Sequence, residues 1–312
     1  MNLKIMDVTI RESTYIENIS LSEQNAIDIV KNLSHSNIDF IEIGYISKYN
    51  YKNIFKSCSI SLIDKLSNCL NNKSSLVLML RPEEYDNQLL KYLINPRIGL
   101  LRLCIFPNNI TSSILLIKKL KKLNIPISAN LTRISNLSFN EIITLSHLFQ
   151  KAGADYLYLA DSNGAMLPQE IEHIFNILNK EINLKLGFHP HDNLRTATVN
   201  TLNAIKNGAT IIDASLYGYG KELANLPLQS FIALIKKMNL REDIDLNKII
   251  KTANNLYNDK LSVGFSKYLN NRECNILTGY YNINLDFIKK LKIEANKRNI
   301  NFIDILLDKS IL

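Results

Sequence analysis

The chain has 312 residues, of which 46% are apolar and 21% are charged, a composition typical of a globular protein that buries a large core. The net charge of +8 comes from scattered lysines, whereas a nucleic-acid-binding face needs a basic stripe interleaved with aromatic residues, so we expect no nucleic acid and at most attraction of small anions. The N-terminus carries no signal-peptide stretch, and no run reaches the about eighteen apolar residues that a membrane helix needs. The four cysteines lack C-x-x-C spacing and show no disulfide pattern. We therefore expect a cytoplasmic protein with no membrane contact.

Eight apolar, strand-like runs recur along the chain, at residues 3–10, 38–45, 75–80, 99–105, 125–131, 154–161, 184–189 and 209–216. Several are nearly continuously apolar, as the strands of a parallel sheet covered on both faces must be. Amphipathic, helix-like stretches separate them, for example at 22–36, 110–124 and 140–153. No Gly-rich phosphate-binding turn follows the first run, which argues against a dinucleotide-binding fold.

Eight βα units in so short a span indicate a closed barrel more than an open sheet. We therefore expect an α/β fold, a (β/α)₈ TIM barrel over residues 1–240 that is closed by a helix at 226–239. Residues 241–312 read as helices, at 244–259 and 285–309, and we expect them to form a C-terminal helical extension that packs on the barrel.

In this fold the chemistry lies at the carboxyl ends of the strands, so polar residues there are the candidates for function. The first run ends in Arg11 and Glu12, with Tyr15 just beyond. The later strand ends and the closing loop add a second group: Glu42, Tyr45, Arg81, Asn130, Thr132, Asp161, Ser162, His189, His191 and Asn225.

The stretch "GFHPHDN" (187–193) holds two of the five histidines of the chain. On a strand, His189 and His191 project to the same side, and paired imidazoles can share a metal. For an isolated pair, the structural reading, in which both histidines bond the backbone, is favoured roughly two to one over a ligand pair. A carboxylate from strand one changes the balance, because strands one, seven and eight are neighbours in a closed barrel. Glu12, both histidines and the Asn225 amide oxygen would form a mixed N/O site suited to Mn²⁺, Mg²⁺ or Co²⁺.

Several candidates have a structural alternative. Arg11 would equally pair with Asp7 or Glu42, and Asp161 or Ser162 would equally cap a helix. Three kinds of residue are read as structural: Asp192, which points away from the histidine pair; the helical histidines His35, His147 and His173; and the tyrosines of "TGYYN" (278–282).

Four stretches resemble a known family: "DVTIRESTY", "YLADSNGAMLPQEI", "GFHPHDNLRTATVNTLNAIKNGATIIDASLYGYGKELANLPL" and "TGYYNINLDFIKKLKIEANKRNINFIDILLDK". The first is similar to the D-x-T-x-R-D-G opening of the metal-dependent pyruvate aldolases and acyl-transferring synthases, and the other three look like the corresponding stretches of the 4-hydroxy-2-oxovalerate aldolases. The D-S-x-G-A-M-L-P wording favours the aldolases over the isopropylmalate synthases, which usually read D-T-x-G there. The resemblance covers essentially the whole chain.

The resemblance implies roles for individual residues. Glu12, His189 and His191 match the family's metal ligands, Asn225 matches an asparagine of the closing loop, and Arg11 matches the arginine that stabilises the enolate. Tyr15 stands where the hydroxy-oxovalerate aldolases carry a histidine base, and an unperturbed phenol of pKa about 10 is a poor base. Two further departures are Glu12 in place of an aspartate and Ser13 in place of a glycine. Arg81, Asp161 and Ser162 are expected to bind substrate.

The sequence thus predicts a divalent-metal-dependent class II pyruvate aldolase, a carbon–carbon lyase that cleaves or forms a 4-hydroxy-2-oxo acid, with Mn²⁺ preferred. The alternatives are a Claisen-type synthase that uses an acyl-CoA and a non-catalytic barrel that serves as an assembly partner. The resemblance further implies a small 2-oxo acid and an aldehyde as substrates. It also implies an aldehyde dehydrogenase partner, or a homo-oligomer, on the C-terminal helices.

Overall fold

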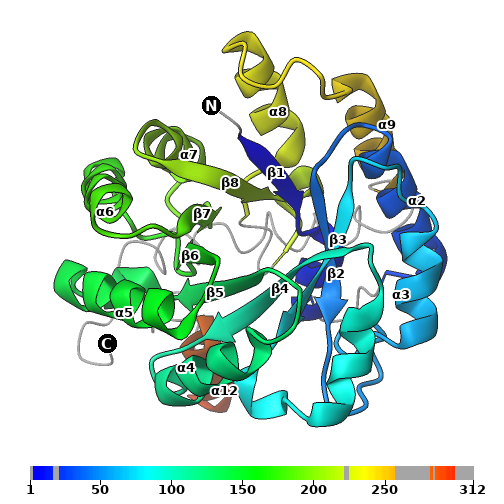
Figure 1. Ribbon diagram of the computed structural model, residues 1–312. Helices are drawn as coiled ribbons and strands as arrows, with labels where there is room; N and C mark the ends of the chain where they lie inside the picture. Colours follow the sequence, from blue (N-terminus) through cyan, green and yellow to red (C-terminus); the bar gives the residue numbers. More distant parts are fainter. Residues whose placement is uncertain (1–2, 17–20, 221–224, 257–281, 284, 299–312) are drawn as a thin grey trace.

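A computed structural model describes residues 3–16, 21–220, 225–256, 282–283 and 285–298. Eight parallel strands pair in sequence order and close into a barrel, with β8 hydrogen-bonded to β1 (Figure 1). The predicted (β/α)₈ TIM barrel is therefore confirmed. The strands are β1 (Lys4–Asp7), β2 (Phe40–Tyr45), β3 (Ser75–Leu80), β4 (Ile98–Ile105), β5 (Ile127–Thr132), β6 (Tyr156–Asp161), β7 (Lys185–Pro190) and β8 (Ala209–Ala214).

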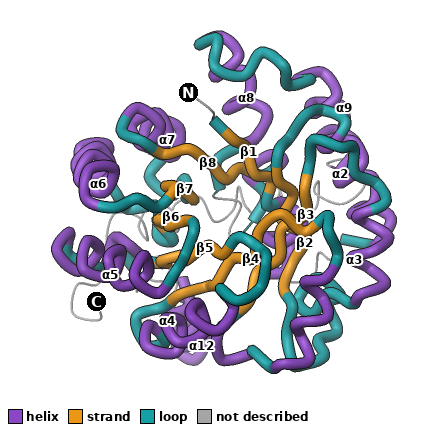
Figure 2. The backbone as a smooth tube through the Cα atoms, viewed as in Figure 1, coloured by secondary structure: helices purple, strands orange, loops and turns teal. Residues whose placement is uncertain are grey.

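Helices surround the strands (Figure 2). They are α2 (Glu23–Ser34), α3 (Ile60–Ser67), α4 (Ile110–Leu120), α5 (Phe139–Ala152), α6 (Pro168–Glu181), α7 (Ala197–Lys206) and α8 (Leu228–Lys237). Local signals mark their ends: Ser138 and Glu141 form a capping box at the start of α5, and Gly153 ends that helix with φ 98°. Between β3 and β4 the chain forms two 3₁₀ segments, Pro82–Glu84 and Asn87–Ile94.

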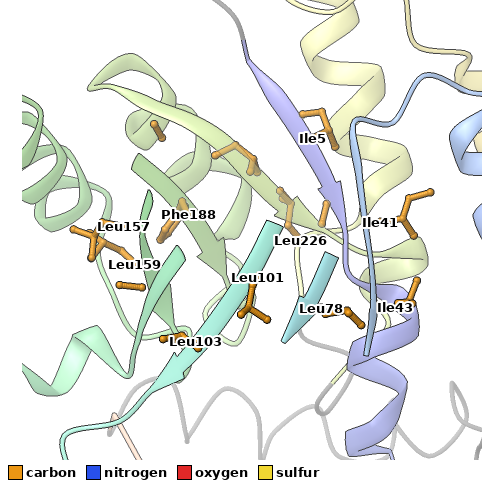
Figure 3. Close-up of a cluster of buried hydrophobic side chains, with 14 of the residues drawn as sticks. Ile5, Ile41, Ile43, Leu78, Leu101, Leu103, Leu157, Leu159, Phe188 and Leu226 are labelled. Carbon is orange, nitrogen blue, oxygen red and sulfur yellow. The ribbon is translucent and has the colours of Figure 1, made fainter. Parts of the chain in front are cut away.

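Alternation along each strand divides the core into two parts. One set of apolar side chains, including Ile41, Leu101 and Leu157, packs with the apolar faces of the helices (Figure 3). The other set fills the barrel interior with Met6, Val8, Phe40, Val77, Leu100, Tyr156, Tyr158 and Ile211. Inward-facing residues nearer the carboxyl ends are instead polar, which is the end where a TIM barrel places its chemistry.

The first strand is shorter than the sequence predicts, and the expectation that it ends in Arg11 and Glu12 is wrong. It ends at Asp7, whose carboxylate accepts hydrogen bonds from the backbone N–H (3.1 Å) and hydroxyl (2.7 Å) of Thr9. This side-chain bond starts a turn, and α1 (Thr9–Glu12) follows. The strand propensity of the apolar run is therefore overridden by a local polar contact, and Arg11 and Glu12 enter the site from a helical turn.

The described part of the C-terminal region is helical, with α9 (Leu246–Leu256) packed against α2 and α8. In α12 (Leu285–Arg298), Ile288, Leu291 and Ala295 are buried. The division of the chain at residue 240 stays a prediction. The "TGYY" tyrosines and Cys274 lie outside the described residues. Among the described helices, none is long and apolar enough to cross a membrane.

Candidate active site

A cavity of about 270 Å³ opens at the carboxyl ends of the strands. Its walls follow the period of two of a β-strand, because residues two apart face the same side. Most of the lining residues are strand-end candidates of the sequence, and the complete set is Arg11, Glu12, Tyr15, Met79, Arg81, Arg102, Cys104, Phe106, Asn130, Thr132, Arg133, Ala160, Ser162, His189 and His191. This volume lies near the lower end of small-molecule sites, about 300–1,000 Å³.

Glu12, His189 and His191 form a compact group at the buried end of this cavity. One ligand atom from each lies within 4.8 Å of the others, and all three residues are buried. His189 Nε2 is 3.5 Å from Glu12 Oε1, and the two imidazole ring centres are 5.1 Å apart. Within the described chain this group could bind a metal ion, as the spacing of the histidines and the closure of the barrel predict.

Asp213 on β8 orients His189 from behind. Its Oδ2 is 2.9 Å from His189 Nδ1, so the Nδ1–H tautomer donates to the carboxylate and the Nε2 lone pair faces Glu12. Asp213 also accepts a hydrogen bond of 2.7 Å from Arg102. Burial alone would raise the pKa of Asp213, but the charge of Arg102 and the contact with His189 outweigh it, and the pKa lies below its usual value. Asp213 therefore stays a carboxylate that holds the imidazole in a metal-binding form.

Asn225 completes the group from the closing loop. Its backbone pairs with that of His191 in an isolated antiparallel bridge, and its side chain is buried. Nδ2 donates to the carbonyl of Tyr219, whereas Oδ1 is buried with no hydrogen-bond partner among the described residues. A Cβ at Gly220 would lie 2.0 Å from Asn225 Nδ2 and 2.8 Å from Glu12 Oε2. The amide thus lies close to the Glu12 carboxylate, with an oxygen left over for a ligand.

Arg11 links this group to a buried ion-pair network. Its Nε donates to Glu42 at 2.6 Å, and one terminal nitrogen pairs with Glu12. Glu42 in turn pairs with Arg102 at 3.2 Å, which reaches Asp213. The alternative that Arg11 pairs with a barrel carboxylate is thus confirmed for Glu42. Arg11 also lines the cavity, so the pairing places its charge beside the group of Glu12, His189 and His191.

Tyr15 lies at the cavity wall with its hydroxyl bonded to that of Tyr45. Met79, Cys104 and Phe106 pack around the two rings. Burial raises the pKa of the Tyr15 phenol and raises that of Tyr45 well above its ordinary value. Both phenols therefore remain protonated at neutral pH and act as hydrogen-bond donors, which makes Tyr15 a still poorer base than an unperturbed tyrosine.

The neighbours Asp161 and Ser162 have different surroundings. Ser162 lines the cavity, and its Oγ accepts a hydrogen bond of 3.0 Å from the Arg133 backbone. Asp161 is not among the lining residues: its carboxylate accepts hydrogen bonds from the backbone of Ala165 (3.2 Å) and Met166 (3.0 Å). Burial raises its pKa to about 6. Asp161 therefore holds the loop before α6, a role similar to the helix-capping role that the sequence left open. Ser162 instead faces the cavity.

The residues read as structural behave in that way where they are described. Asp192 accepts from the backbone of Ala197 (3.0 Å) and pairs with Arg195 (3.0 Å). His173 packs on Phe139 with ring centres 5.0 Å apart, and His147 is exposed near Glu181. His35 is exposed and contacts a carbonyl of its own helix.

Sequence reasoning missed Asp213, Arg102 and Arg133. A signal was present for the first two, because each is a charged residue inside an apolar strand run, "ATIIDASL" and "GLLRLCI". A charge in such a run must face a buried partner or a site. Arg133 follows β5 directly, but nothing in its local sequence sets it apart from a solvated loop residue.

Comparison with known proteins points in one direction. The family described as HMGL-like matches residues 106–256. A 4-hydroxy-2-oxovalerate aldolase of Bacillus cereus is 24% identical over 311 residues, which cover 98% of this chain and 89% of that protein. The chain is a homologue of the 4-hydroxy-2-oxovalerate aldolases. The resemblance read from the motifs is thereby confirmed, and the chain is an enzyme of the carbon–carbon lyase class.

Solved structures support the fold. The N-terminal domain of a candidate aldolase from Bacteroides vulgatus has a TM-score of 0.75 at 24% identity, covering 90% of this chain and 93% of that one. The HMG-CoA lyase of Bacillus subtilis has a TM-score of 0.71 at 18% identity, covering 82% and 93%. At these identities the likeness concerns the barrel alone.

Proposed function

We propose that this homologue of the pyruvate aldolases is a divalent-metal-dependent class II aldolase that forms or cleaves a 4-hydroxy-2-oxo acid from pyruvate and an aldehyde. The observation that carries the proposal is the buried group of Glu12, His189 and His191, with Arg11 beside it and Asp213 behind it. A carboxylate and two imidazoles on a cavity wall, next to a fixed guanidinium, suit the binding of a 2-oxo acid and its activation toward an enolate.

The residues present fit a divalent ion. Glu12, His189, His191 and the Asn225 amide oxygen would hold it, and this mixed N/O set suits Mn²⁺, with Mg²⁺ or Co²⁺ as alternatives. When bound, the ion supplies Lewis-acid polarisation of the C2 carbonyl of the 2-oxo acid. The buried Asn225 oxygen supports this assignment, because an amide acceptor otherwise loses a hydrogen bond on burial.

Arg11 and Ser162 would act on the pyruvate portion. The bonds of Arg11 to Glu42 and Glu12 use Nε and one terminal nitrogen, so the second terminal nitrogen has no acceptor among the described residues. That nitrogen would place positive charge where the enolate oxygen gains negative charge. The Ser162 hydroxyl, which accepts from the Arg133 backbone, keeps its proton to donate to the substrate carboxylate.

Tyr15 would act on the aldehyde portion. Its protonated phenol, bonded to Tyr45, would donate a hydrogen bond to the carbonyl oxygen of the acceptor as that oxygen gains charge. In bond formation the phenolic proton would pass to the new 4-oxygen. Tyr15 is half-buried and lines the cavity, so it would regain a proton from solvent, which would also take up the proton lost from the pyruvate methyl group. A Tyr15→Phe variant should therefore lose condensation activity while it retains metal binding.

The first test is exchange of the pyruvate methyl protons in heavy water, with Mn²⁺ or Mg²⁺ and then with excess chelator. Enolate formation alone introduces deuterium, so the acceptor need not be known. The wild-type protein should exchange only with the metal. A folded His189→Ala variant should not exchange, and His147→Ala, which removes an exposed histidine from α5, should behave as wild type. Full exchange by His189→Ala would refute the proposal.

The C-terminal helices are the proposed contact region for an aldehyde dehydrogenase or for a second copy of the chain. Two observations on α12 support a contact there: Phe287 and Ile293 are exposed apolar side chains, whereas Ile288 and Leu291 are buried. Sedimentation of the protein alone, and then with an aldehyde dehydrogenase, tests both partners.

A further inference from the structure

The outer part of the cavity carries two arginines that the pyruvate chemistry does not use. Arg81 follows β3 and Arg133 follows β5, and both line the cavity. Both are half-buried, whereas Glu12, His189 and His191 are buried, so the two arginines lie nearer the mouth. Among the described lining residues, Glu12 is the one carboxylate, and it belongs to the metal group.

Each of these guanidiniums rests on an aromatic ring. That of Arg81 lies 4.2 Å from the centre of the Tyr45 ring, and that of Arg133 lies 5.0 Å from the centre of the Phe106 ring. Stacking fixes a guanidinium plane and lowers the entropy lost when it binds a ligand. A flexible surface arginine has no such support, so both side chains are oriented in advance.

The hydrogen bonds of Arg81 leave donors for a ligand. NH1 donates to Glu84 Oε1 at 3.0 Å, and within the described chain neither Nε nor NH2 has an acceptor. A planar guanidinium with two nitrogens to spare matches a carboxylate or a phosphate, which accept two parallel hydrogen bonds.

The backbone of Arg133 is held in an unusual conformation. Its φ of 58° lies in the left-handed region, which is unfavourable for a residue other than glycine. The same conformation lets its N–H bond Ser162 Oγ at 3.0 Å, beside the proposed pyruvate site. The backbone of Arg133 is therefore fixed to a residue of the cavity wall, and its side chain lines the same cavity.

We infer that the acceptor aldehyde carries its own anionic group, a carboxylate or a phosphate, which Arg81 and Arg133 bind at the mouth of the cavity. The inference rests on the proposed aldolase function and names its second substrate class. An uncharged aldehyde would leave the spare nitrogens of Arg81 without an acceptor and would gain nothing from the charge of Arg133, so it would be the poorer substrate. The general positive charge of the chain, +8, also favours the approach of an anion.

The test compares matched aldehydes in condensation with pyruvate. Succinic semialdehyde is paired with pentanal, which has no carboxylate, and glyceraldehyde 3-phosphate is paired with glyceraldehyde. In each pair the readout is the ratio of the two kcat/KM values, which cancels any general loss of activity. At least one anionic member should exceed its neutral partner by about 10- to 100-fold, the range for hydrogen bonds to a charged group. The pair that shows this ratio identifies carboxylate or phosphate.

Three variants connect that ratio to the arginines. Arg81→Met should reduce it about tenfold, Arg81→Lys should restore part of it, and Arg81→Met combined with Arg133→Met should bring it close to one. Arg298→Met removes the same charge from the exposed end of α12 and should keep the wild-type ratio. A ratio near one in the wild type, or one that the double variant preserves, overturns the inference.

Deuterium exchange of pyruvate separates this inference from the function on which it rests. If the wild type exchanges and yet prefers neutral aldehydes, the anionic acceptor is wrong and the aldolase proposal stands. If the wild type does not exchange with any divalent ion, the aldolase proposal fails, and the acceptor inference fails with it.

Discussion

Replacement of Asp213 by asparagine tests whether the residue behind the metal group is functional. The substitution keeps the shape of the side chain but removes the charge that faces both His189 (2.9 Å) and Arg102 (2.7 Å). Both groups bond the same oxygen, Oδ2, so an asparagine oxygen in its place can still accept from both, and what the substitution removes is the negative charge. We expect the uncharged acceptor to hold the Nδ1–H tautomer of His189 less firmly.

The magnitude follows from these two contacts. Loss of the partner of a metal-binding histidine weakens metal affinity about 10- to 100-fold. Loss of the charge that neutralises the buried Arg102 lowers the free energy of unfolding by about 3 kcal/mol, reduced to the extent that Glu42, at 3.2 Å, still compensates. Asp213→Asn should therefore lower both the metal affinity and the free energy of unfolding. The loss of metal affinity should not occur when a buried aspartate elsewhere is replaced.

Calorimetric titration of the metal-free protein with Mn²⁺ measures the first effect, and urea unfolding measures the second. Asp161→Asn is the matched control, because it neutralises another fully buried aspartate whose partners are backbone N–H groups. The control should bind Mn²⁺ as the wild type does. If Asp213→Asn also binds Mn²⁺ with wild-type affinity, the orienting role of Asp213 is refuted.

Three further predictions concern buried positions near the site. Burial raises the pKa of Asp7 to about 7 from 3.8, so its contribution to stability is complete below about pH 4 and is lost as pH rises through about 7. Urea unfolding at pH 5 and pH 8 should therefore show a loss of up to about 3 kcal/mol that Asp7→Asn lacks. Gly187→Ala should lower the free energy of unfolding by at least about 1–3 kcal/mol, because its Cβ would lie 2.5 Å from Tyr158 ring atoms, and a wild-type thermal midpoint would contradict this. Gly220→Ala should weaken Mn²⁺ binding, because the added Cβ would displace the Asn225 side chain. Titration calorimetry measures the affinity, and an unchanged value would contradict this prediction.

The sequence was sufficient for the barrel because several strands are nearly continuous apolar runs, and eight strand-like runs with helices between them close in one common way. It was insufficient at the end of β1. There the run "LKIMDVTI" is apolar enough for a longer strand, but one carboxylate–Thr9 contact turns the chain at Asp7. Such a local side-chain contact competes with strand pairing, and a single contact of this kind can end a strand. The spacing of apolar residues carries no information about it.

The metal group was accessible to sequence reasoning because two of its members lie two apart on one strand. Asp213 was not, because its position depends on strand register. In the closed barrel Phe188 pairs with Ile212, which brings the next inward residues, His189 and Asp213, side by side. The sequence shows that a charged residue lies in an apolar run, but it does not show which residue of the neighbouring strand that side chain contacts. The same limit applies to Arg133, whose backbone conformation and stacking on Phe106 arise only in the folded loop.

The two departures from the aldolase motif have a common explanation in α1. Ser13 stands in place of a glycine, but its φ is −56°, so this turn does not require the conformation that favours glycine. Its hydroxyl donates to the carbonyl of Ile10 at 2.6 Å, which supports the turn. Glu12, the other departure, ends this helical turn, and its longer side chain still brings Oε1 to 3.5 Å from His189 Nε2. The altered motif therefore preserves the carboxylate–imidazole group, because the turn fixes the backbone and the longer side chain reaches the imidazole.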